Sequence, residues 1–468
     1  MLEKNTLNNY TSLFISLFLI FFFSLYQINF EDLWFDELLT FSITNPELSN
    51  LDTYNLIIKE ENTPPIYYFL IKIYFNFFGY DYQLIRLPNI IFNVFSLLIF
   101  FSILKEISRD NKFIFLSLIL FSLNFFLIAY SQEARVYSFY LLISLAYIKF
   151  YLKTFNLNNS ISIRLLLPLF LLSIILINTF LFSFLIIGTS IFFEFIKKQN
   201  LKKKILINFI LIFSIIVSIY INYDYYEKVI TFKAVSISNP NVDFFLFNFF
   251  FKDFFGSKIM GFIFFIFFIF SIFILIKKKF LNEKFLYLVL LVFFSYLIPI
   301  SYGYLLTPVL LDKYIIYIIP IIILCISFAV INLESSKKKI IIIFFLITLT
   351  FSNQILKNIK KEIDKPEFTK ILNMLNIQNN SNFFLGSFMD HKNSYFNLIV
   401  ENLVTQIIKD QNLKLKKNAK NKNFWIICYD PSNTFKYCIK DNILLNNGQS
   451  IKETITTYQV AAILINRE

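Results

Sequence analysis

Long apolar stretches separated by short polar ones constrain this sequence more than any other feature. Runs of about 17–25 apolar residues recur over the first three quarters of the chain. Such a run crosses the hydrocarbon core of a bilayer as an α-helix, because the helix pairs its own backbone polar groups. We therefore predict an α-helical polytopic membrane protein with about eleven transmembrane helices. The predicted spans are 11–29, 85–104, 113–130, 138–155, 164–178, 179–196, 205–222, 259–276, 285–302, 309–332 and 340–355.

Two parts of this assignment leave alternatives. The stretches 164–178 and 179–196 are either two spans or one long tilted helix with a re-entrant piece. The apolar segment 64–80 starts with two prolines, which suits a helix start. Counting it as a span would reverse the sidedness of every later loop. We therefore predict a helix that lies in the outer interface, with Lys72 and Asn76 on one polar stripe.

The charge pattern predicts an orientation. Charged residues make up 16% of the chain, against about 25% in soluble proteins, and the net charge is +13. Basic residues gather in the loops 105–112, 149–164, 197–204, 277–284 and 335–339, which all fall on one side. The positive-inside rule makes that side cytoplasmic, with the N-terminus inside and the C-terminus outside a plasma (inner) membrane. Because membrane lipids explain the basic clusters, we predict no nucleic-acid partner.

The polar segments define the predicted domains. Residues 1–355 form the transmembrane domain, with large outer loops at 30–84 and 223–258. Residues 356–468 are polar and mixed in charge, and predict a small extracytoplasmic α/β domain. Its expected elements are a helix at 366–377, a strand at 382–387, a helix at 393–409, a strand at 424–429, and strands near 435–439 and 453–466. Cys428 and Cys438 in this domain either form a disulfide or stay as thiols.

The first candidate site is an acidic pair just outside the first span. Asp36 and Glu37 follow Trp34 in a loop rich in acids. Two adjacent carboxylates at a membrane surface can deprotonate a hydroxyl or hold a divalent ion. Solvated loop acids are the alternative. With His391 as the single histidine, a Ser-His-Asp triad or a His-rich metal site in the membrane region is excluded.

Two further motifs fall on the same predicted side. Glu133, Arg135 and Tyr137 lie at the outer end of the third span, where an acid and a base could meet a lipid phosphate or metal. A local Glu–Arg pair at a helix junction is the alternative. Lys313 and Tyr314 lie at the outer end of a late span, where the lysine either grips a lipid phosphate or snorkels.

Together these motifs resemble the large membrane glycosyltransferases of the GT-C class. The nearest groups are the protein O-mannosyltransferases, the lipid A aminoarabinose transferase and their bacterial relatives. The resemblance covers residues 10 to about 355 and rests on matching stretches in the same order. They are Leu33 to Leu39, Thr63 to Tyr68, Phe78-Gly79, Arg86 to Pro88, Tyr130 to Tyr137 and Lys313-Tyr314. The departures are Thr63, where relatives commonly have His, Asn178-Thr179, where many have His or Tyr, and Lys313, where they usually have Arg.

The resemblance implies a polyprenyl-phosphate-linked sugar as donor and a hydroxyl on a lipid, glycan or protein as acceptor, with inversion at the anomeric carbon. It implies that Asp36 is the catalytic base, with Glu37 beside it. Glu133 and Tyr137 form the second acidic motif. The cations and the tyrosine that would contact the donor phosphate are Arg86, Arg135, Lys313 and Tyr314.

A divalent metal ion with Asp36 and Glu133 as ligands is left open, and we expect no organic cofactor. Transport or flipping of lipid-linked sugars is the alternative function, and a scaffold or receptor whose outer domain binds a partner is a third. Transport predicts ionisable residues at mid-membrane, whereas the acids of this chain gather at one outer surface.

Overall fold

The computed structural model divides the chain into two compact units, which are described separately. It describes residues 2–155, 163–197, 201–231, 250–278, 282–361, 363–377, 382–385, 394–417, 423–429, 435 and 449–467. The first, helical unit contains Met1–Tyr26, Ser49–Ile71 and Arg86–Lys360. The second, mixed unit contains Gln27–Leu48, Lys72–Ile85 and Lys361–Glu468.

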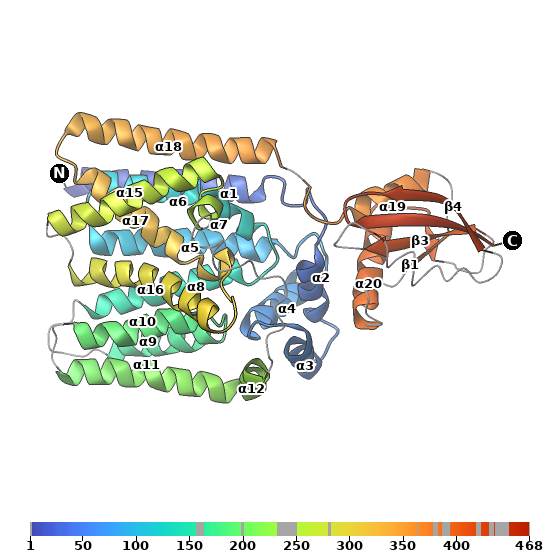
Figure 1. The fold of residues 1–468 in the computed structure, drawn as a ribbon, viewed down its shortest axis with the longest axis horizontal. Coiled ribbons are helices and arrows are strands. Elements are labelled where there is room, and N and C mark those ends of the chain that lie inside the picture. The colour runs from blue at the N-terminus through green and yellow to red at the C-terminus, as the bar shows by residue number, and fades with distance from the viewer. Residues whose placement is uncertain are drawn as a thin grey trace. The chain divides into compact units, whose positions relative to one another are not determined.

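The helical unit consists of rod-like helices that pack side by side (Figure 1). Among the contacting pairs are α5 with α8, α1 with α6, and α15 with α17. Its elements are α1 (Leu2–Leu25), α3 (Asn50–Glu60), the start of α4 (Ile66–Phe78), α5 (Leu87–Ile107), α6 (Asn111–Ser122), α7 (Phe125–Ser131), α8 (Tyr137–Thr154), α9 (Ile163–Ile177), α10 (Ser183–Ile196), α11 (Leu201–Ile221), α12 (Tyr223–Thr231), α14 (Phe250–Phe254), α15 (Lys258–Lys277), α16 (Glu283–Leu305), η1 (Asp312–Ile315), α17 (Ile318–Ile331) and α18 (Ser336–Ile359).

Five of the described helices are long and apolar enough to cross a membrane: α5, α11, α15, α16 and α18. A sixth span is possible if α6 and α7, which meet at a bend of 50°, are counted together. The apolar helices α9, α10 and α17 are shorter, with 15, 14 and 14 residues. The predicted membrane-helix class agrees with these helices, but the count of eleven spans is not confirmed.

Short polar side chains set where many helices begin. In each case a side-chain oxygen accepts a hydrogen bond from a backbone N–H of the first turn, which would otherwise lack a helical partner. The same rule explains the break inside the predicted span 113–130. In the middle of that span, Asn124 caps the start of a new helix, α7. The capping residues are Asp110 for α6, Asn124 for α7, Ser257 for α15, Asn282 for α16 and Ser335 for α18.

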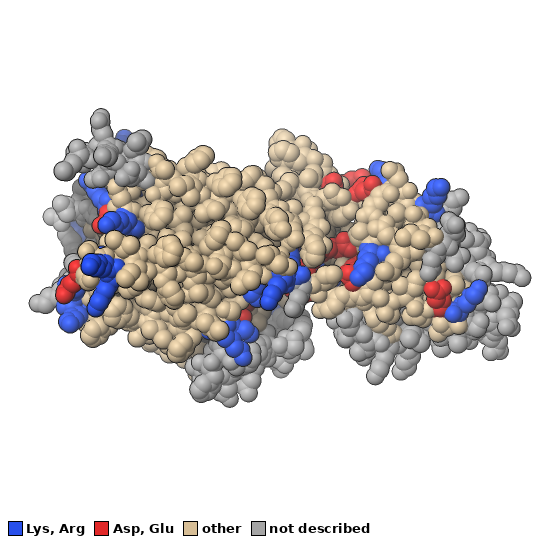
Figure 2. All heavy atoms as spheres, turned by 90° about the horizontal axis from the view of Figure 1, so that it is seen from above, with Lys and Arg blue, Asp and Glu red and all other residues tan. Residues whose placement is uncertain are grey.

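The basic loops come together at one end of the helical unit. Lys284 donates to the carboxylate of Glu106 at 2.9 Å, and Lys278 donates to the carbonyl of Asn332 at 2.8 Å. In Figure 2 Lys and Arg side chains gather at this end, whereas most of the flank is tan. A band of uncharged side chains between charged ends is typical of helices that lie in a bilayer.

The helix α4 corrects one local expectation. The segment 64–80 is helical as predicted, over Ile66–Phe78. However, Lys72 and Asn76 do not share an exposed stripe, because Lys72 is buried and Asn76 is exposed. The Lys72 ammonium donates to the carbonyl of Leu48 at 2.6 Å within the mixed unit. The lysine therefore closes a loop instead of facing headgroups.

The mixed unit contains a five-stranded sheet in the order β2-β1-β3-β5-β4. The strands β2, β1 and β3 run parallel, whereas β3, β5 and β4 pair antiparallel. Alternate residues of β3 and β5 form an apolar cluster on one face, as the period of two in a strand requires. The elements are α2 (Phe35–Ile43), α19 (Phe368–Ile377), β1 (Asn382–Leu385), α20 (Ser394–Asp410), β2 (Lys416–Lys417), β3 (Asn423–Tyr429), β4 (Gln449–Thr456) and β5 (Val460–Arg467).

The α/β class predicted for the C-terminal region agrees with this unit, but one strand was wrong. The predicted strand at 453–466 is a hairpin of β4 and β5, which turns near Gln459 with a φ of 57°. The predicted strand near 435–439 lies outside the described residues except for Phe435, and so do Cys438 and His391. Of the two alternatives left open for Cys428, the structure has this residue in a disulfide.

Candidate active site

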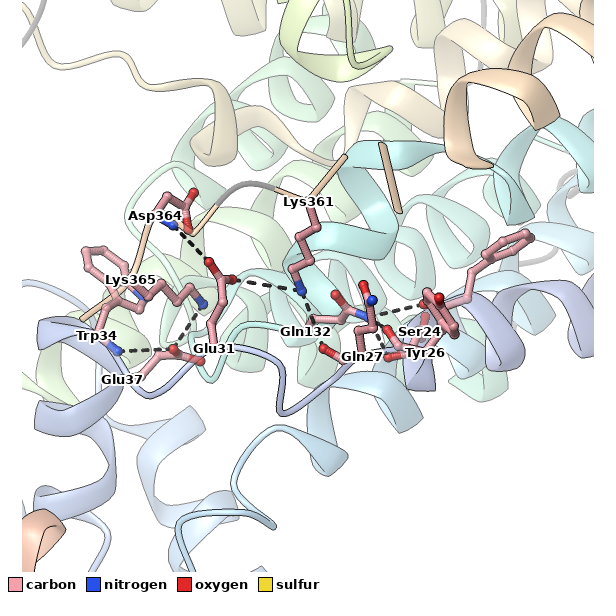
Figure 3. A network of polar contacts seen from close by, with 11 residues as sticks. Ser24, Tyr26, Gln27, Glu31, Trp34, Glu37, Gln132, Lys361, Asp364 and Lys365 are labelled. Carbon is pink, nitrogen blue, oxygen red and sulfur yellow. Dashed lines mark hydrogen bonds and ion pairs between the residues drawn. The ribbon is translucent and has the colours of Figure 1, made fainter. Parts of the chain in front are cut away.

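The turn between α7 and α8 carries the second acidic motif and is anchored to the end of α1. The amide nitrogen of Gln132 donates to the carbonyls of Ser24 at 3.1 Å and Tyr26 at 2.7 Å (Figure 3). The hydroxyl of Ser131 also donates to that of Ser24 at 2.9 Å. The last carbonyls of a helix have no partner within it, so these donors satisfy α1 and fix the turn.

Asn89 joins this turn to the start of α5. Its side-chain amide donates to the carbonyl of Arg135 at 2.7 Å and also to the carbonyl of Glu133. Its side-chain oxygen accepts from the hydroxyl of Tyr67 at 3.2 Å. Arg86, which precedes α5 and is buried, therefore lies one helical turn from the residue that holds the acidic motif.

Arg135 forms an ion pair with Glu61, a residue that the sequence did not single out. Its two terminal nitrogens meet the two carboxylate oxygens at 2.5 and 3.1 Å. The two side chains are only 8% and 3% exposed. This bidentate, buried geometry is the strong form of a guanidinium–carboxylate contact. The partners are 74 residues apart in the chain, so no local pattern could have indicated them.

A second cation approaches the same loop from α12. The ammonium of Lys228 donates to the backbone carbonyl of Glu61 at 2.9 Å, and the hydroxyl of Tyr225 donates to that of Asn62 at 2.7 Å. Burial lowers the pKa of Lys228, and the nearby charge of Glu61 opposes this shift. The helix α12, in a segment whose sequence suggested only an outer loop, thus contributes a cation that binds the backbone of Glu61, the partner of Arg135.

Lys313 and Tyr314 meet the motif from η1. The Lys313 ammonium lies 5.1 Å from the centre of the Tyr137 ring, a cation–π distance. The Tyr314 ring packs on Phe180 and Phe182, each with centroids 5.0 Å apart. The structure therefore brings together Lys313, Tyr314 and Tyr137 as neighbours within the helical unit.

Next to these residues lie two carboxyl groups that were not proposed for the site. Burial raises the pKa of Asp253 in α14, and the negative charge of Asp312 raises it further. The backbone N–H of Lys313 donates to Asp312 at 2.7 Å. Burial also raises the pKa of Asp312, so both acids beside Lys313 hold a proton more tightly than a solvated aspartate does.

Asp36 and Glu37 belong to the mixed unit, in the first turn of α2. Glu37 is 0% exposed, and its carboxylate accepts from the backbone N–H of Trp34 at 3.4 Å and from Lys365 at 3.1 Å (Figure 3). Asp36 is half-buried, and its backbone carbonyl accepts from the hydroxyl of Thr40 at 2.9 Å. Of the two adjacent acids, only Asp36 keeps a side chain that solvent or substrate can reach.

The two proposed metal ligands, Asp36 and Glu133, lie in separate units. Within the described ranges, no three or more acidic, His or Cys side chains form a group suited to a metal ion. A metal at these two positions stays a prediction, and no chemical step below depends on it. The meeting of Asp36 with Glu133 and Lys313 likewise stays a prediction.

Comparison with known proteins gives a fold match without a sequence match. No protein-family model matches the chain, and no curated protein matches it in sequence. ArnT from Cupriavidus metallidurans in the apo state superposes with a TM-score of 0.59 at 9% identity, and the match covers 95% of each chain. Its structure bound to undecaprenyl phosphate gives 0.57 at 9% identity over 97% of each chain.

A second neighbour is the archaeal oligosaccharyltransferase AglB from Archaeoglobus fulgidus, in complex with an inhibitory peptide and a dolichol-phosphate. It matches with a TM-score of 0.58 at 8% identity over 93% of this chain and 71% of that one. The chain has the GT-C fold. The fold resemblance predicted from the sequence motifs is thereby confirmed. Since the match to ArnT covers nearly all of both chains, it includes the C-terminal region as well as the helical unit.

Proposed function

We propose that this protein is an inverting glycosyltransferase. It moves a sugar from a polyprenyl-phosphate donor to a hydroxyl on a cell-surface lipid, glycan or protein, at the outer face of the membrane. The observation that carries the proposal is the GT-C fold over almost the whole chain, shared with an ArnT structure that holds undecaprenyl phosphate. The hydroxyl acceptor and the outer location follow from the resemblance of the sequence motifs.

The donor phosphate is expected at the end of the helical unit where Arg86, Arg135 and Lys313 lie. A polyprenyl phosphate cannot leave the bilayer, so its headgroup must meet cations near the ends of the spans. The leaving phosphate gains negative charge in the transition state, and nearby cations stabilise that charge. Tyr314 beside Lys313, and Tyr137 beneath its ammonium, support a fixed position for this lysine.

Arg135 can take part even though it pairs with Glu61. The bidentate contact engages two of the five guanidinium N–H groups, so it does not by itself exclude a phosphate. The pair also fixes the orientation of the guanidinium before any ligand arrives. Catalysis gains most from donors that need no rearrangement during the reaction.

Asp36 is the proposed general base. The acceptor oxygen attacks the anomeric carbon as the bond from that carbon to the phosphate oxygen breaks. The hydroxyl proton passes to the Asp36 carboxylate, and the polyprenyl phosphate leaves with the bonding electron pair. One displacement of this kind inverts the anomeric centre. Glu37 is buried against Lys365, and so we assign it a supporting role.

The test is a chromosomal Asp36→Asn variant, with mass spectrometry of surface lipids and glycans. We expect a product sugar that disappears on deletion of the gene and falls at least about 100-fold in the variant, because general bases contribute about that much or more. Glu47→Gln is the matched control, since Glu47 is an exposed acid of the same loop. Unchanged product in Asp36→Asn at equal protein levels would remove Asp36 as the base.

The alternative of a transporter or flippase predicts charges at mid-membrane. Besides Glu61, the helical unit buries the acid Glu194, which pairs with Lys197 at 3.5 Å. This pair lies at the last turn of α10, next to a basic loop, and not at the middle of the helix. Movement of lipid-linked sugar across liposomes without transfer would favour the alternative.

A further inference from the structure

We infer that Lys365, on the segment that leads from α18 into the C-terminal sheet, is a positioning residue for Asp36 and acts on it through Glu37. The inference rests on the proposed function, because it assigns a residue to the same reaction. It concerns the mixed unit alone, where the first loop and the segment 361–369 pack together.

The contact between Glu37 and Lys365 is the central observation. Glu37 is 0% exposed, whereas the Lys365 side chain is 17% exposed, and their charged atoms are 3.1 Å apart. A carboxylate removed from water is strongly destabilised unless a cation and hydrogen bonds compensate it. Lys365 supplies such a cation, and the N–H of Trp34 supplies a hydrogen bond at the start of α2.

Two neighbouring acids of the first loop bind the same distant segment (Figure 3 shows the first). The Glu31 carboxylate accepts from the backbone N–H of Asp364 at 3.0 Å. Asp32 accepts from the N–H and the hydroxyl of Thr369, each at 2.7 Å. Thr369 lies in the first turn of α19, so Asp32 provides a cap for that helix from another part of the chain.

In sequence, these contacts lie on both sides of the proposed base, at Glu31 and Asp32 before it and at Glu37 after it. Asp36 precedes Glu37 in the first turn of α2, so its backbone moves with the residue that Lys365 holds. A displacement of about 1 Å in a reacting group can lower a rate about 100-fold. Lys365 therefore fixes the backbone position from which the Asp36 side chain extends, and it does so without touching the substrate.

The experiment compares Lys365→Met with Lys365→Arg in purified full-length protein in nanodiscs. Turnover is followed with undecaprenyl-phosphate-linked sugars drawn from the membranes of the producing cell. Binding is followed separately with undecaprenyl phosphate alone. We expect Lys365→Met to lower kcat between about tenfold and 100-fold. We expect undecaprenyl phosphate binding to stay within about twofold, because the proposed phosphate ligands belong to the helical unit.

Lys365→Arg keeps the cation and should restore kcat to within about threefold of the unmodified protein. Lys370→Met is the matched control, because Lys370 forms an ion pair with Glu367 on the same segment but is 52% exposed. It should leave kcat within about twofold. A kcat for Lys365→Met equal to that of the control would overturn the inference.

A double variant separates positioning from general damage. Glu37→Gln removes the charge that Lys365 compensates, so adding Lys365→Met to it should cost little more. Suppose that Lys365→Met alone loses binding of undecaprenyl phosphate. The double variant should then regain that binding. A double variant that still does not bind contradicts the inference. Multiplied losses in the double variant also contradict it. Full activity in Asp36→Asn would refute the proposed function itself, whatever Lys365 does.

Discussion

At the residue scale, the Arg135–Glu61 pair places two opposite charges in the interior of the helical unit. Both charges are almost fully buried, so each has lost most of its hydration. The two-pronged contact compensates this loss only while both partners are present. Removing one partner therefore leaves a buried charge, which is far more harmful than removing both.

We expect Glu61→Gln to lower the free energy of unfolding by about 3–5 kcal/mol, because Arg135 keeps its charge without its counterion. A double replacement of Glu61 and Arg135 by leucine should recover most of that loss. The measurement is unfolding in mixed micelles. Glu60→Gln serves as control, since Glu60 pairs with the exposed Lys59 and should change stability by less than about 1 kcal/mol. Equal losses for Glu61→Gln and its control would disprove the assignment.

Asp253 gives a prediction about pH. Its pKa is raised in the folded protein, first by burial and then by the charge of Asp312. The folded state therefore holds this proton more tightly than the unfolded state does. The resulting stability is fully present below the ordinary aspartate pKa of about 4 and is lost as the pH rises through the raised value.

We expect the Tm in detergent to fall as the pH rises from about 4 toward neutrality, and Asp253→Asn to flatten that fall. Asp224→Asn, which changes an exposed acid on α12, should leave the slope unchanged. A steeper slope in Asp253→Asn would show that the sign is wrong.

At the element scale, the helices were the predictable part of the fold. Their apolar runs and their capping residues are local features, so each predicted span overlaps an observed helix or helix pair. The misses have distant causes. Asn124 interrupts the span 113–130 while its amide donates to the carbonyl of Phe254, 130 residues away. The sequence predicts Lys72 as part of an exposed polar stripe. In the structure its ammonium instead donates to the carbonyl of Leu48.

The candidate site likewise has a part that local sequence patterns predict and a part that depends on distant contacts. The motifs at Asp36, Glu133 and Lys313 were visible because their residue types cluster in sequence. Their partners Glu61 and Lys365 were not, because the contacts span 74 and 328 residues. A single sequence gives no information about pairing at such a distance.

The tie between Gln132 and the end of α1 should be essential to the turn. Gln132→Glu replaces a donor by a negative charge facing helix-terminal carbonyls, which carry negative partial charge themselves. We expect a loss of about 1–3 kcal/mol in the free energy of unfolding. Gln83→Glu, at an exposed position, is the control and should be nearly neutral. Faster hydrogen exchange at the amides of 132–137 would locate the effect.

At the scale of the whole molecule, the sequence suggested one division, between residues 355 and 356. The boundary between these domains stays a prediction, and the compact units group parts of the first outer loop, Gln27–Leu48 and Lys72–Ile85, with the C-terminal sheet. Composition changes mark where spans end, but they do not record which loop packs with which domain. The orientation in the membrane was also inferred from charge alone, and it stays a prediction.

Cysteine labelling in whole cells checks that orientation. Lys452→Cys lies in the C-terminal sheet and Lys338→Cys in the basic first turn of α18, and both positions are exposed. In a Cys325→Ala background, an impermeant maleimide should label Lys452→Cys in intact cells and Lys338→Cys only after permeabilisation. The opposite pattern would place the proposed active site in the cytoplasm and exclude a donor that faces outward.

The distance between Glu37 and Lys365 along the chain has a consequence for biosynthesis. A ribosome needs about 15–70 s to add the 328 residues between them at about 5–20 residues per second. During that interval Glu37 has no lysine to neutralise it and must stay hydrated outside the nascent helices. The proposed base is therefore expected to reach its working position only after the last quarter of the chain has been made.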